Sequence, residues 1–129
     1  ARRFRSNLRK TPGMLWRLSR SHAAYTQGMD GAGVDLVLSP TLAHTTPKLG
    51  YLSPEQPFEE LFERLMQYAA FTPLANATGA PALSLPMGMT DHNLPVGVRF
   101  SAHHGRERTL LELAFELEEA APWRRIQDR

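Results

Sequence analysis

The segment from residue 71 to residue 102 constrains the fold of this chain more than any other part. It contains two apolar runs, Pro81–Gly88 and Pro95–Ala102, separated by the cluster Thr90–Asn93 (Thr-Asp-His-Asn). Aspartate and asparagine are typical turn residues, because they tolerate the left-handed backbone and hydrogen-bond to their own main chain. Two strand-like runs joined by such a turn indicate an antiparallel hairpin. Prolines bracket the first run and cannot donate to a strand ladder, so its paired part should be short, about Ala82–Leu85. The hairpin side chains that we expect to be largely buried are Leu83, Leu85, Val98 and Phe100.

Helical patterns flank the hairpin on both sides. Pro57–Ala70 and Glu107–Ala121 repeat apolar side chains at steps of 3 and 4, the spacing of an amphipathic helix. Thr11 is a good N-cap and Pro12 suits the first helical turn, so a further helix should begin there. The glycines at positions 28, 31 and 33 should end it. Ala1–Leu8 has the pattern of the end of another helix.

One more strand is predicted before the hairpin, which makes the chain an α/β segment. Val34–Ser39 is short and β-prone, and Pro40 should end it. Ala43–Gln56 is a long loop, and Asn76–Pro81 is a polar turn between helix and sheet. Four apolar side chains are expected to pack down the long loop and the chain end: Leu49, Tyr51, Leu52 and Trp123. The pattern indicates part of a mixed β-sheet with covering helices.

Charge is unevenly distributed along the chain. Residues 1–25 hold seven of the 15 basic side chains and none of the 13 acidic ones. A basic arm can contact nucleic acid or anionic lipid, but this one lacks aromatics spaced for base stacking, so we favour a helix with a solvated basic face. No apolar run approaches the ~20 residues of a membrane span, and no hydrophobic region follows the basic N-terminus as in a secretory signal. We therefore predict a cytoplasmic protein without a nucleic-acid or membrane partner.

The residue types of common active sites are missing from the chain or misplaced in it. The absence of cysteine excludes thiolate metal sites, and the metalloprotease pattern His-Glu-x-x-His does not occur. The pair His103-His104 fits a polar strand end before the Gly105 turn. We therefore predict no metal site. No glycine-rich dinucleotide or phosphate loop is present, so we predict no cofactor. The lysines, Lys10 and Lys48, lie near no Gly/Ser-rich loop, and there is no Gly-x-Ser-x-Gly. We expect no catalytic residue in this chain, because a nucleophile, a base and oxyanion donors must converge.

Three stretches together carry a resemblance to a known family. FTPLANATGAPALSLPMG at 71–88 and LPVGVRFSAHHGRERTLLELAFELEEAAPW at 94–123 resemble the C-terminal end of amidase signature enzymes. The likeness extends upstream to VDLVLSPTLA at 34–43 and covers roughly three quarters of the chain. It implies that residues 1–129 are the C-terminal segment of a larger amidase domain, with a basic helical segment at 1–33 and a strand-loop-helix-hairpin-helix unit at 34–129. A start at alanine, within a helix, fits a segment of a longer protein.

The resemblance also implies a function for the parent protein. Such enzymes cleave carboxamide C–N bonds through a serine acyl-enzyme, with a Lys-Ser-Ser triad that is not in this segment. The helix end and the Phe-Thr after it line the acyl side of the substrate channel in the family, and the matching residues here are Met66, Ala69, Phe71 and Pro73. In the glutamine amidotransferase branch, an acid at the position of Ala69 holds the substrate's amino group, so alanine disfavours that branch. GYLSPEQPF at 50–58 and NATGAP at 76–81 look closest to the branch that acts on small linear or cyclic aliphatic amides.

Two interpretations of the whole chain stay open at this point. In the first, the chain is part of an amidase, and its partners are a small-molecule amide substrate and the remainder of the amidase chain. The four residues that match the substrate wall can equally be core residues. A homodimer stays possible. In the alternative, the chain is a stand-alone non-enzymatic α/β module that binds a partner or nucleic acid through its basic N-terminal helix. Three predicted strands are too few to protect both edges of a sheet, which favours the first interpretation.

Overall fold

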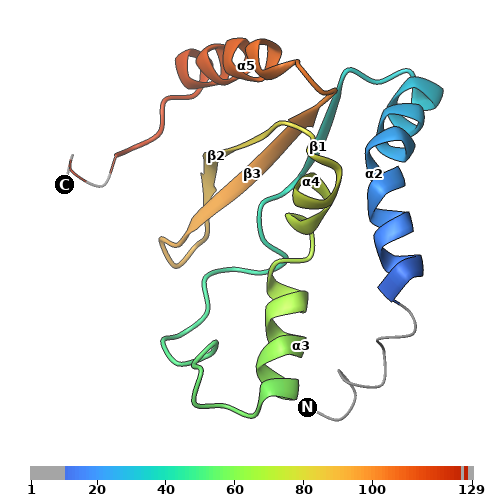
Figure 1. The fold of residues 1–129 in the computed structure, drawn as a ribbon. Coiled ribbons are helices and arrows are strands. Elements are labelled where there is room, and N and C mark those ends of the chain that lie inside the picture. Colours follow the sequence, from blue (N-terminus) through green and yellow to red (C-terminus); the bar gives the residue numbers. More distant parts are fainter. Residues whose placement is uncertain (1–10, 126, 128–129) are drawn as a thin grey trace.

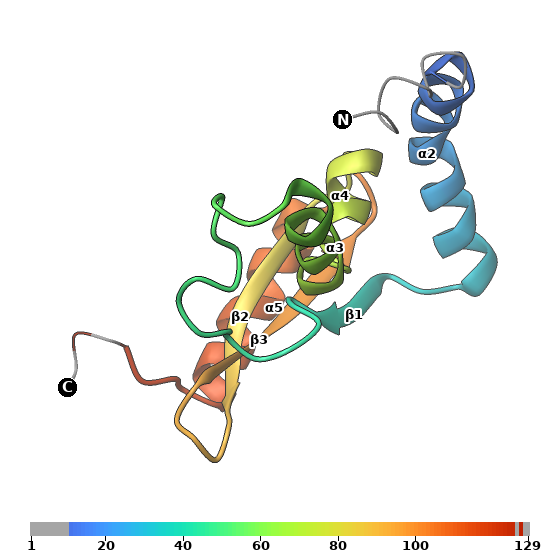
Figure 2. The same cartoon turned by 90° about the horizontal axis from the view of Figure 1, so that it is seen from below.

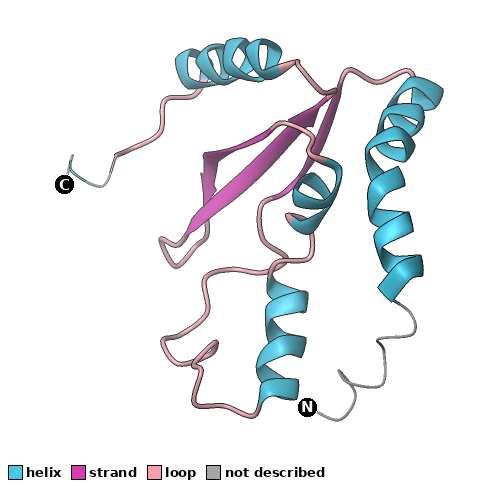
Figure 3. Cartoon of the chain, in the orientation of Figure 1, coloured by secondary structure: helices cyan, strands magenta, loops and turns pink. Residues whose placement is uncertain are grey.

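The structure, a computed structural model, describes residues 11–125 and 127 (Figure 1). The predicted helix at Ala1–Leu8 and the first part of the basic arm lie outside these residues. The described elements follow one another as α2 (Thr11–Ala32), β1 (Leu36–Pro40), α3 (Phe58–Tyr68), α4 (Pro73–Thr78), β2 (Ala82–Met89), β3 (Pro95–Ala102) and α5 (Glu107–Ala120). The α/β prediction is confirmed, with helices around one small sheet (Figure 3). None of the helices in the described residues has the length and apolar character needed to cross a bilayer.

The predicted hairpin forms the centre of the sheet. The strand order is β1-β3-β2, and both pairings are antiparallel. Residues Ala82–Leu85 of β2 pair regularly with Val98–Ser101 of β3, and the ladder is then interrupted until Gly88. Pro86 lies at the interruption, where it has no N–H to donate. The prediction that β2 pairs only over about Ala82–Leu85 therefore holds for the regular part alone, because Gly88 and Met89 pair with β3 again and make the paired strand longer than predicted.

The turn from α2 into β1 moves the first strand two residues downstream of its predicted start. Gly33 has φ 63°, and its N–H donates to the Asp30 carbonyl at 3.1 Å. The N–H of Val34 donates to the Met29 carbonyl at 3.3 Å, so Val34 belongs to the helix end. This left-handed glycine stop satisfies carbonyls that the last helical turn leaves open. The predicted strand Val34–Ser39 is consequently Leu36–Pro40.

A short helix occupies part of the segment that we predicted as a polar turn. Pro73 starts α4 in its first turn, and Gly79 ends it with φ 73°. Proline is pre-organised for a helix start and glycine for its stop, but six residues are too few to show an amphipathic repeat. The Asn76–Pro81 prediction was wrong in this respect, because helix α4 includes Asn76 and Thr78.

The long loop after β1 is held by polar contacts more than by apolar ones. Leu49 is fully exposed, so its predicted packing is wrong, whereas Tyr51 and Leu52 are half-buried. The Arg64 guanidinium of α3 donates to the Tyr51 carbonyl at 3.1 Å and to the Gln56 side-chain oxygen at 2.6 Å. Arg64 therefore ties the loop to α3.

The two faces of the sheet are covered by different helices. Figures 1 and 2 show α5 on one face and α3 with α4 on the other. Leu110 of α5 is 3% exposed and Leu85 of β2 is 8% exposed. The other hairpin residues predicted to be largely buried, Leu83, Val98 and Phe100, are half-buried. Leu38 of β1 stands opposite Phe100 and is 65% exposed, so the apolar face is open toward that edge.

Large apolar faces stay uncovered within the described residues. The amphipathic pattern of α3 is confirmed, but its apolar side chains are about half exposed: Phe58 55%, Phe62 47%, Leu65 44% and Met66 49%. The first half of α2 adds Met14, Leu15, Trp16 and Leu18, all more than half exposed. Among the described strands, β1 and β2 each pair with β3 alone. Contiguous apolar surface and open strand edges of this kind mark places where further protein packs.

The packing of α5 on the sheet can be tested with two neighbouring leucines. Leu110→Ala should lower the free energy of unfolding of the chain by about 2–4 kcal/mol, because it opens a cavity in the core. Leu111→Ala is the matched control, since Leu111 is 56% exposed and its truncation should cost less than about 0.5 kcal/mol. Chemical denaturation of both variants measures the difference. Equal losses would show that α5 does not present this face to the sheet.

Candidate functional site

The four residues predicted to form a substrate wall lie on one continuous stretch. Met66 is in the last turns of α3, and Ala69 is the C-cap of that helix. Phe71 lies in the link to α4, and Pro73 is the first residue of α4. Met66 and Phe71 are 49% and 36% exposed, Pro73 is exposed and Ala69 is half-buried. The stretch is therefore apolar, uncharged and accessible on the surface of the described residues.

The start of the long loop holds the end of α3 in place. The N–H of Ala43 donates to the Tyr68 carbonyl at 3.0 Å, and the ring of His44 lies 4.7 Å from that of Tyr68. The N–H of Ala69 donates to the Leu65 carbonyl at 2.9 Å, and the Thr72 hydroxyl donates to the Ala69 carbonyl at 3.3 Å. These bonds satisfy the carbonyls at the helix end and fix the direction of the link.

The turn after α4 is organised by a buried threonine. Thr78 is 5% exposed, and its hydroxyl donates to the Leu74 carbonyl at 2.9 Å. The same hydroxyl oxygen accepts from the N–H of Ala80 at 3.3 Å. Thr78 therefore satisfies buried backbone at the turn from α4 into β2.

Arg99 of β3 is a buried cation that sequence reasoning missed. It is 5% exposed, and its Nη1 donates to the Phe71 carbonyl at 3.0 Å. Its direct neighbours across the sheet are Ser39 of β1 and Ser84 of β2. The signal was present in the alternation of β3, because the period that places Val98 and Phe100 on one face places Arg99 on the other. Charged side chains are rarely buried unless they are paired, so an arginine on a predicted central strand was the sequence signal for an unusual site.

The end of β3 joins α2 to the hairpin through histidines. His104 Nε2 lies 2.9 Å from the Thr78 carbonyl oxygen, and its ring centroid lies 3.6 Å from that of His22. His103 Nε2 lies 3.6 Å from an Asp30 carboxylate oxygen. Gly105 turns the chain with φ 76°, as predicted for a polar strand end. In the part of the chain that the structure describes, no group of three His, Asp or Glu side chains is arranged to hold a metal ion.

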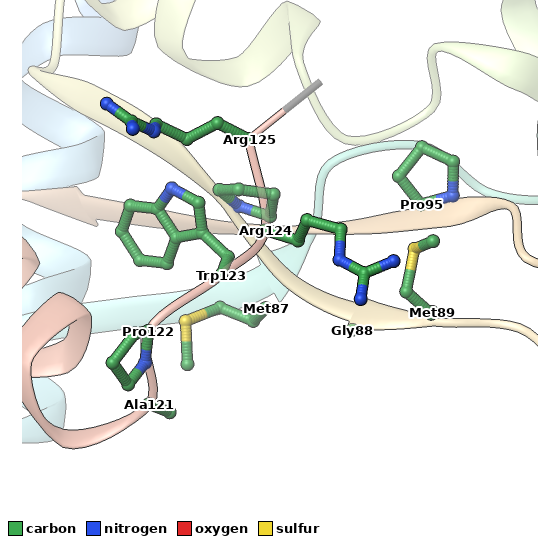
Figure 4. A pocket seen from close by; sticks show the side chains of 10 residues that line it. Met87, Gly88, Met89, Pro95, Ala121, Pro122, Trp123, Arg124 and Arg125 are labelled. Carbon is green, nitrogen blue, oxygen red and sulfur yellow. The ribbon is translucent and has the colours of Figure 1, made fainter. Parts of the chain in front are cut away.

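A groove opens between the hairpin and the segment after α5 (Figure 4). Its volume is about 470 Å³, and it is lined by Pro86–Met89, Pro95 and Ala121–Arg125. Trp123 is half-buried and lies against the hairpin, which confirms that it packs back onto the body. None of the four predicted wall residues lines this groove.

No catalytic constellation is assembled within residues 11–125 and 127. Ser39, Ser84 and Ser101 lie on the strands, and Lys48 is exposed on the long loop without a hydrogen bond to any of them. Lys10 is outside the described residues. The pKa of Arg108 is raised because its guanidinium hydrogen-bonds to the Glu112 carboxylate at 2.6 Å, but this pair sits on the exposed side of α5.

Comparison with known proteins identifies the family of the chain. A family model described as Amidase matches residues 2–111. The chain is 46% identical over 121 residues to a protein of Mycobacterium leprae named as an amidase, AmiC. The aligned region covers 94% of this chain and 25% of that protein. It is 40% identical over 98 residues to 6-aminohexanoate-cyclic-dimer hydrolase of Paenarthrobacter ureafaciens, over 71% of this chain and 20% of that protein.

A solved structure agrees with the sequence comparisons. The structure of 6-aminohexanoate cyclic dimer hydrolase complexed with substrate matches with a TM-score of 0.71 and 38% identity, over 84% of this chain and 24% of that chain. The chain thus spans between 20% and 25% of the length of these relatives. Since the family model covers most of its residues, this chain belongs to the Amidase family, the amidase signature enzymes.

Proposed function

We propose that this chain, residues 1–129, is the C-terminal segment of an amidase. In the parent protein it supplies part of the sheet and one wall of the acyl pocket. The parent protein cleaves a carboxamide by serine attack, releases ammonia or an amine, and hydrolyses the acyl-enzyme with water. Its Lys-Ser-Ser triad lies outside this segment. The observation that carries the proposal is the family match together with the share of its relatives, 25% or less, that the chain covers.

The uncovered surfaces of the chain support a larger parent. The apolar face of α3 (Phe58, Phe62, Leu65 and Met66) is about half exposed, and the β1 and β2 edges are open within the described strands. The remainder of the amidase chain is the partner that would cover them, by extending the sheet and packing on the helix. The alternative, a stand-alone non-enzymatic module, has no comparable support. The family model matches residues 2–111, which include the basic N-terminal segment through which such a module would bind its partner.

The wall of the acyl pocket is the stretch Met66, Ala69, Phe71 and Pro73. These side chains carry no charge, and at least three of them are accessible in the described chain. An apolar wall favours an uncharged acyl chain, since an ammonium or carboxylate placed there would lose its hydration without gaining a partner. Similarity to a hydrolase of a cyclic aliphatic amide, 6-aminohexanoate cyclic dimer, agrees with small linear or cyclic aliphatic amides as the substrate class. A cytoplasmic location and a homodimer stay predictions.

The first test of this proposal concerns the isolated chain. The 129-residue chain should show no turnover of simple aliphatic or aromatic amides, whereas the parent protein should hydrolyse an aliphatic amide. Ammonia release from both proteins under the same conditions measures this. Activity of the isolated chain that survives further purification, and is lost when Ser39, Ser84 or Ser101 is replaced by alanine, would contradict the proposal.

The second test concerns Ala69 in the parent protein. Ala69→Asp should lower kcat/KM for a neutral aliphatic amide by about tenfold or more, because a carboxylate would be placed among apolar side chains. An amino-bearing analogue should be less affected, so the ratio of the two kcat/KM values should change. Ala70→Asp is the matched control, since Ala70 is exposed and lies one residue further along. A ratio that stays constant in Ala69→Asp would mean that Ala69 does not face the substrate.

A further inference from the structure

The sheet face that carries Arg99 is polar along its whole central row. Residues directly opposite each other in an antiparallel sheet share a face, so Ser39, Arg99 and Ser84 form one row across β1, β3 and β2. Arg99 is 5% exposed, while Ser39 is half-buried and Ser84 is exposed. The row therefore places Arg99 between two serines, both of which are at least partly accessible.

The next position along β3 brings a third hydroxyl onto this face. Thr41 packs over Gly97, where an added Cβ would lie only 2.8 Å from the Thr41 Oγ1. The Thr41 hydroxyl donates to the Ser84 Oγ at 3.2 Å. Because each hydroxyl has one hydrogen, the hydrogen of Ser84 stays available for another acceptor among the groups around it. The close approach over Gly97 thus brings the Thr41 and Ser84 hydroxyls together on the face that carries Arg99.

The charge of Arg99 has no counter-charge in the part of the chain that the structure describes. Its hydrogen bond goes to a neutral acceptor, the Phe71 carbonyl. Ion pairs in the described residues join Arg64 to Glu60, Arg108 to Glu112 and His103 to Asp30, but none includes Arg99. A guanidinium has five donors in a planar fork that matches a carboxylate, and burying it without an anion is costly.

The partner carbonyl of Arg99 locates this charge relative to the proposed pocket. Phe71 is one of the four residues of the proposed acyl wall, and the Arg99 Nη1 lies 3.0 Å from its carbonyl oxygen. The guanidinium therefore lies directly behind the link between α3 and α4. An anion held by Arg99 would stand next to the wall without being part of its apolar surface.

We propose that Arg99, which shares its face of the sheet with Ser39 and Ser84, binds a carboxylate there. The inference rests on the proposed function, since both sources of the carboxylate belong to the parent enzyme. One source is an aspartate or glutamate from the remainder of the amidase chain, which would close the face. The other is a carboxylate on the substrate, which would reach past the apolar wall.

Two variants of the parent protein separate the charge of Arg99 from its size. Arg99→Gln keeps a hydrogen-bond donor but removes the charge, and Arg99→Lys keeps the charge. Arg106→Gln is the control, because Arg106 is exposed and its side chain makes no capping hydrogen bond to α5. The measurements are Tm without substrate, and kcat/KM for a neutral aliphatic amide and for its analogue with a terminal carboxylate on the acyl chain.

The two sources of the carboxylate give different results. With a protein carboxylate, Arg99→Gln should lower Tm by several degrees, because it leaves a buried acid unpaired, while Arg99→Lys should retain most of the wild-type value. With a substrate carboxylate, Arg99→Gln should leave Tm unchanged or raise it. It should then lower kcat/KM for the carboxylate-bearing amide at least tenfold relative to the neutral one, and Arg99→Lys should recover part of this loss.

The same measurements can overturn the inference. A Tm that does not fall in Arg99→Gln, combined with an unchanged ratio of the two kcat/KM values, would show that no carboxylate is bound. An equal fall in Tm for both variants would assign Arg99 a packing role only. A parent protein that lacks amidase activity would refute the proposed function, and in that case Tm alone decides: a fall confined to Arg99→Gln supports the inference, and any other result overturns it.

Discussion

The register of β3 is the constraint on which the rest of the structure depends. Both neighbouring strands pair with β3, so its alternation decides what each face of the sheet presents. In the observed register, Phe100 stands between Leu38 and Leu83, and Arg99 stands between the two serines of the opposite face. A slip of one residue would exchange these faces, burying a guanidinium against α5 and turning Phe100 toward the polar row. The hairpin turn and the interruption at Pro86 hold this register, because each fixes how many residues face each other.

The chain buries little of its own apolar surface, which agrees with the proposal that it is a segment of a larger enzyme. The buried apolar side chains of the described part are Met29, Ala80, Leu85, Ala102 and Leu110. Meanwhile, α3 and the first half of α2 expose their large apolar residues. A free-standing domain of this size can normally cover such faces, because it buries roughly two thirds of its unfolded surface. Amidase relatives of which the chain covers a quarter or less offer the missing surface.

The link between α3 and α4 is the point where the proposed pocket and the sheet meet. Phe71 contributes its side chain to the proposed wall and its carbonyl to Arg99. The helix on one side of the link is held by Ala43 and His44 of the long loop, and Thr78 closes the other side. A substitution in the polar row of the sheet can therefore shift the wall by moving one peptide group.

Local sequence patterns determined most of the elements, their order along the chain and the family. Amphipathic repeats specified α3 and α5, and two apolar runs with a turn between them specified the hairpin, because these signals need only neighbouring residues. The short helix α4, with six residues, lay below the length at which periodicity can be read. The four wall residues could be named from a family resemblance, but Arg99 could not be singled out that way.

Only the tertiary structure decided what each face meets. Leu49 and Arg64 show this most clearly: the leucine expected to pack is fully exposed, and an arginine of the amphipathic helix α3 holds the loop. In the sequence, Arg99 is the polar residue of an alternating strand. Its burial beside Phe71 follows from the way α3 and α4 lie on the sheet. The physical reason is that periodicity fixes which side chains share a face, whereas burial and hydrogen-bond partners depend on contacts between residues far apart in the chain.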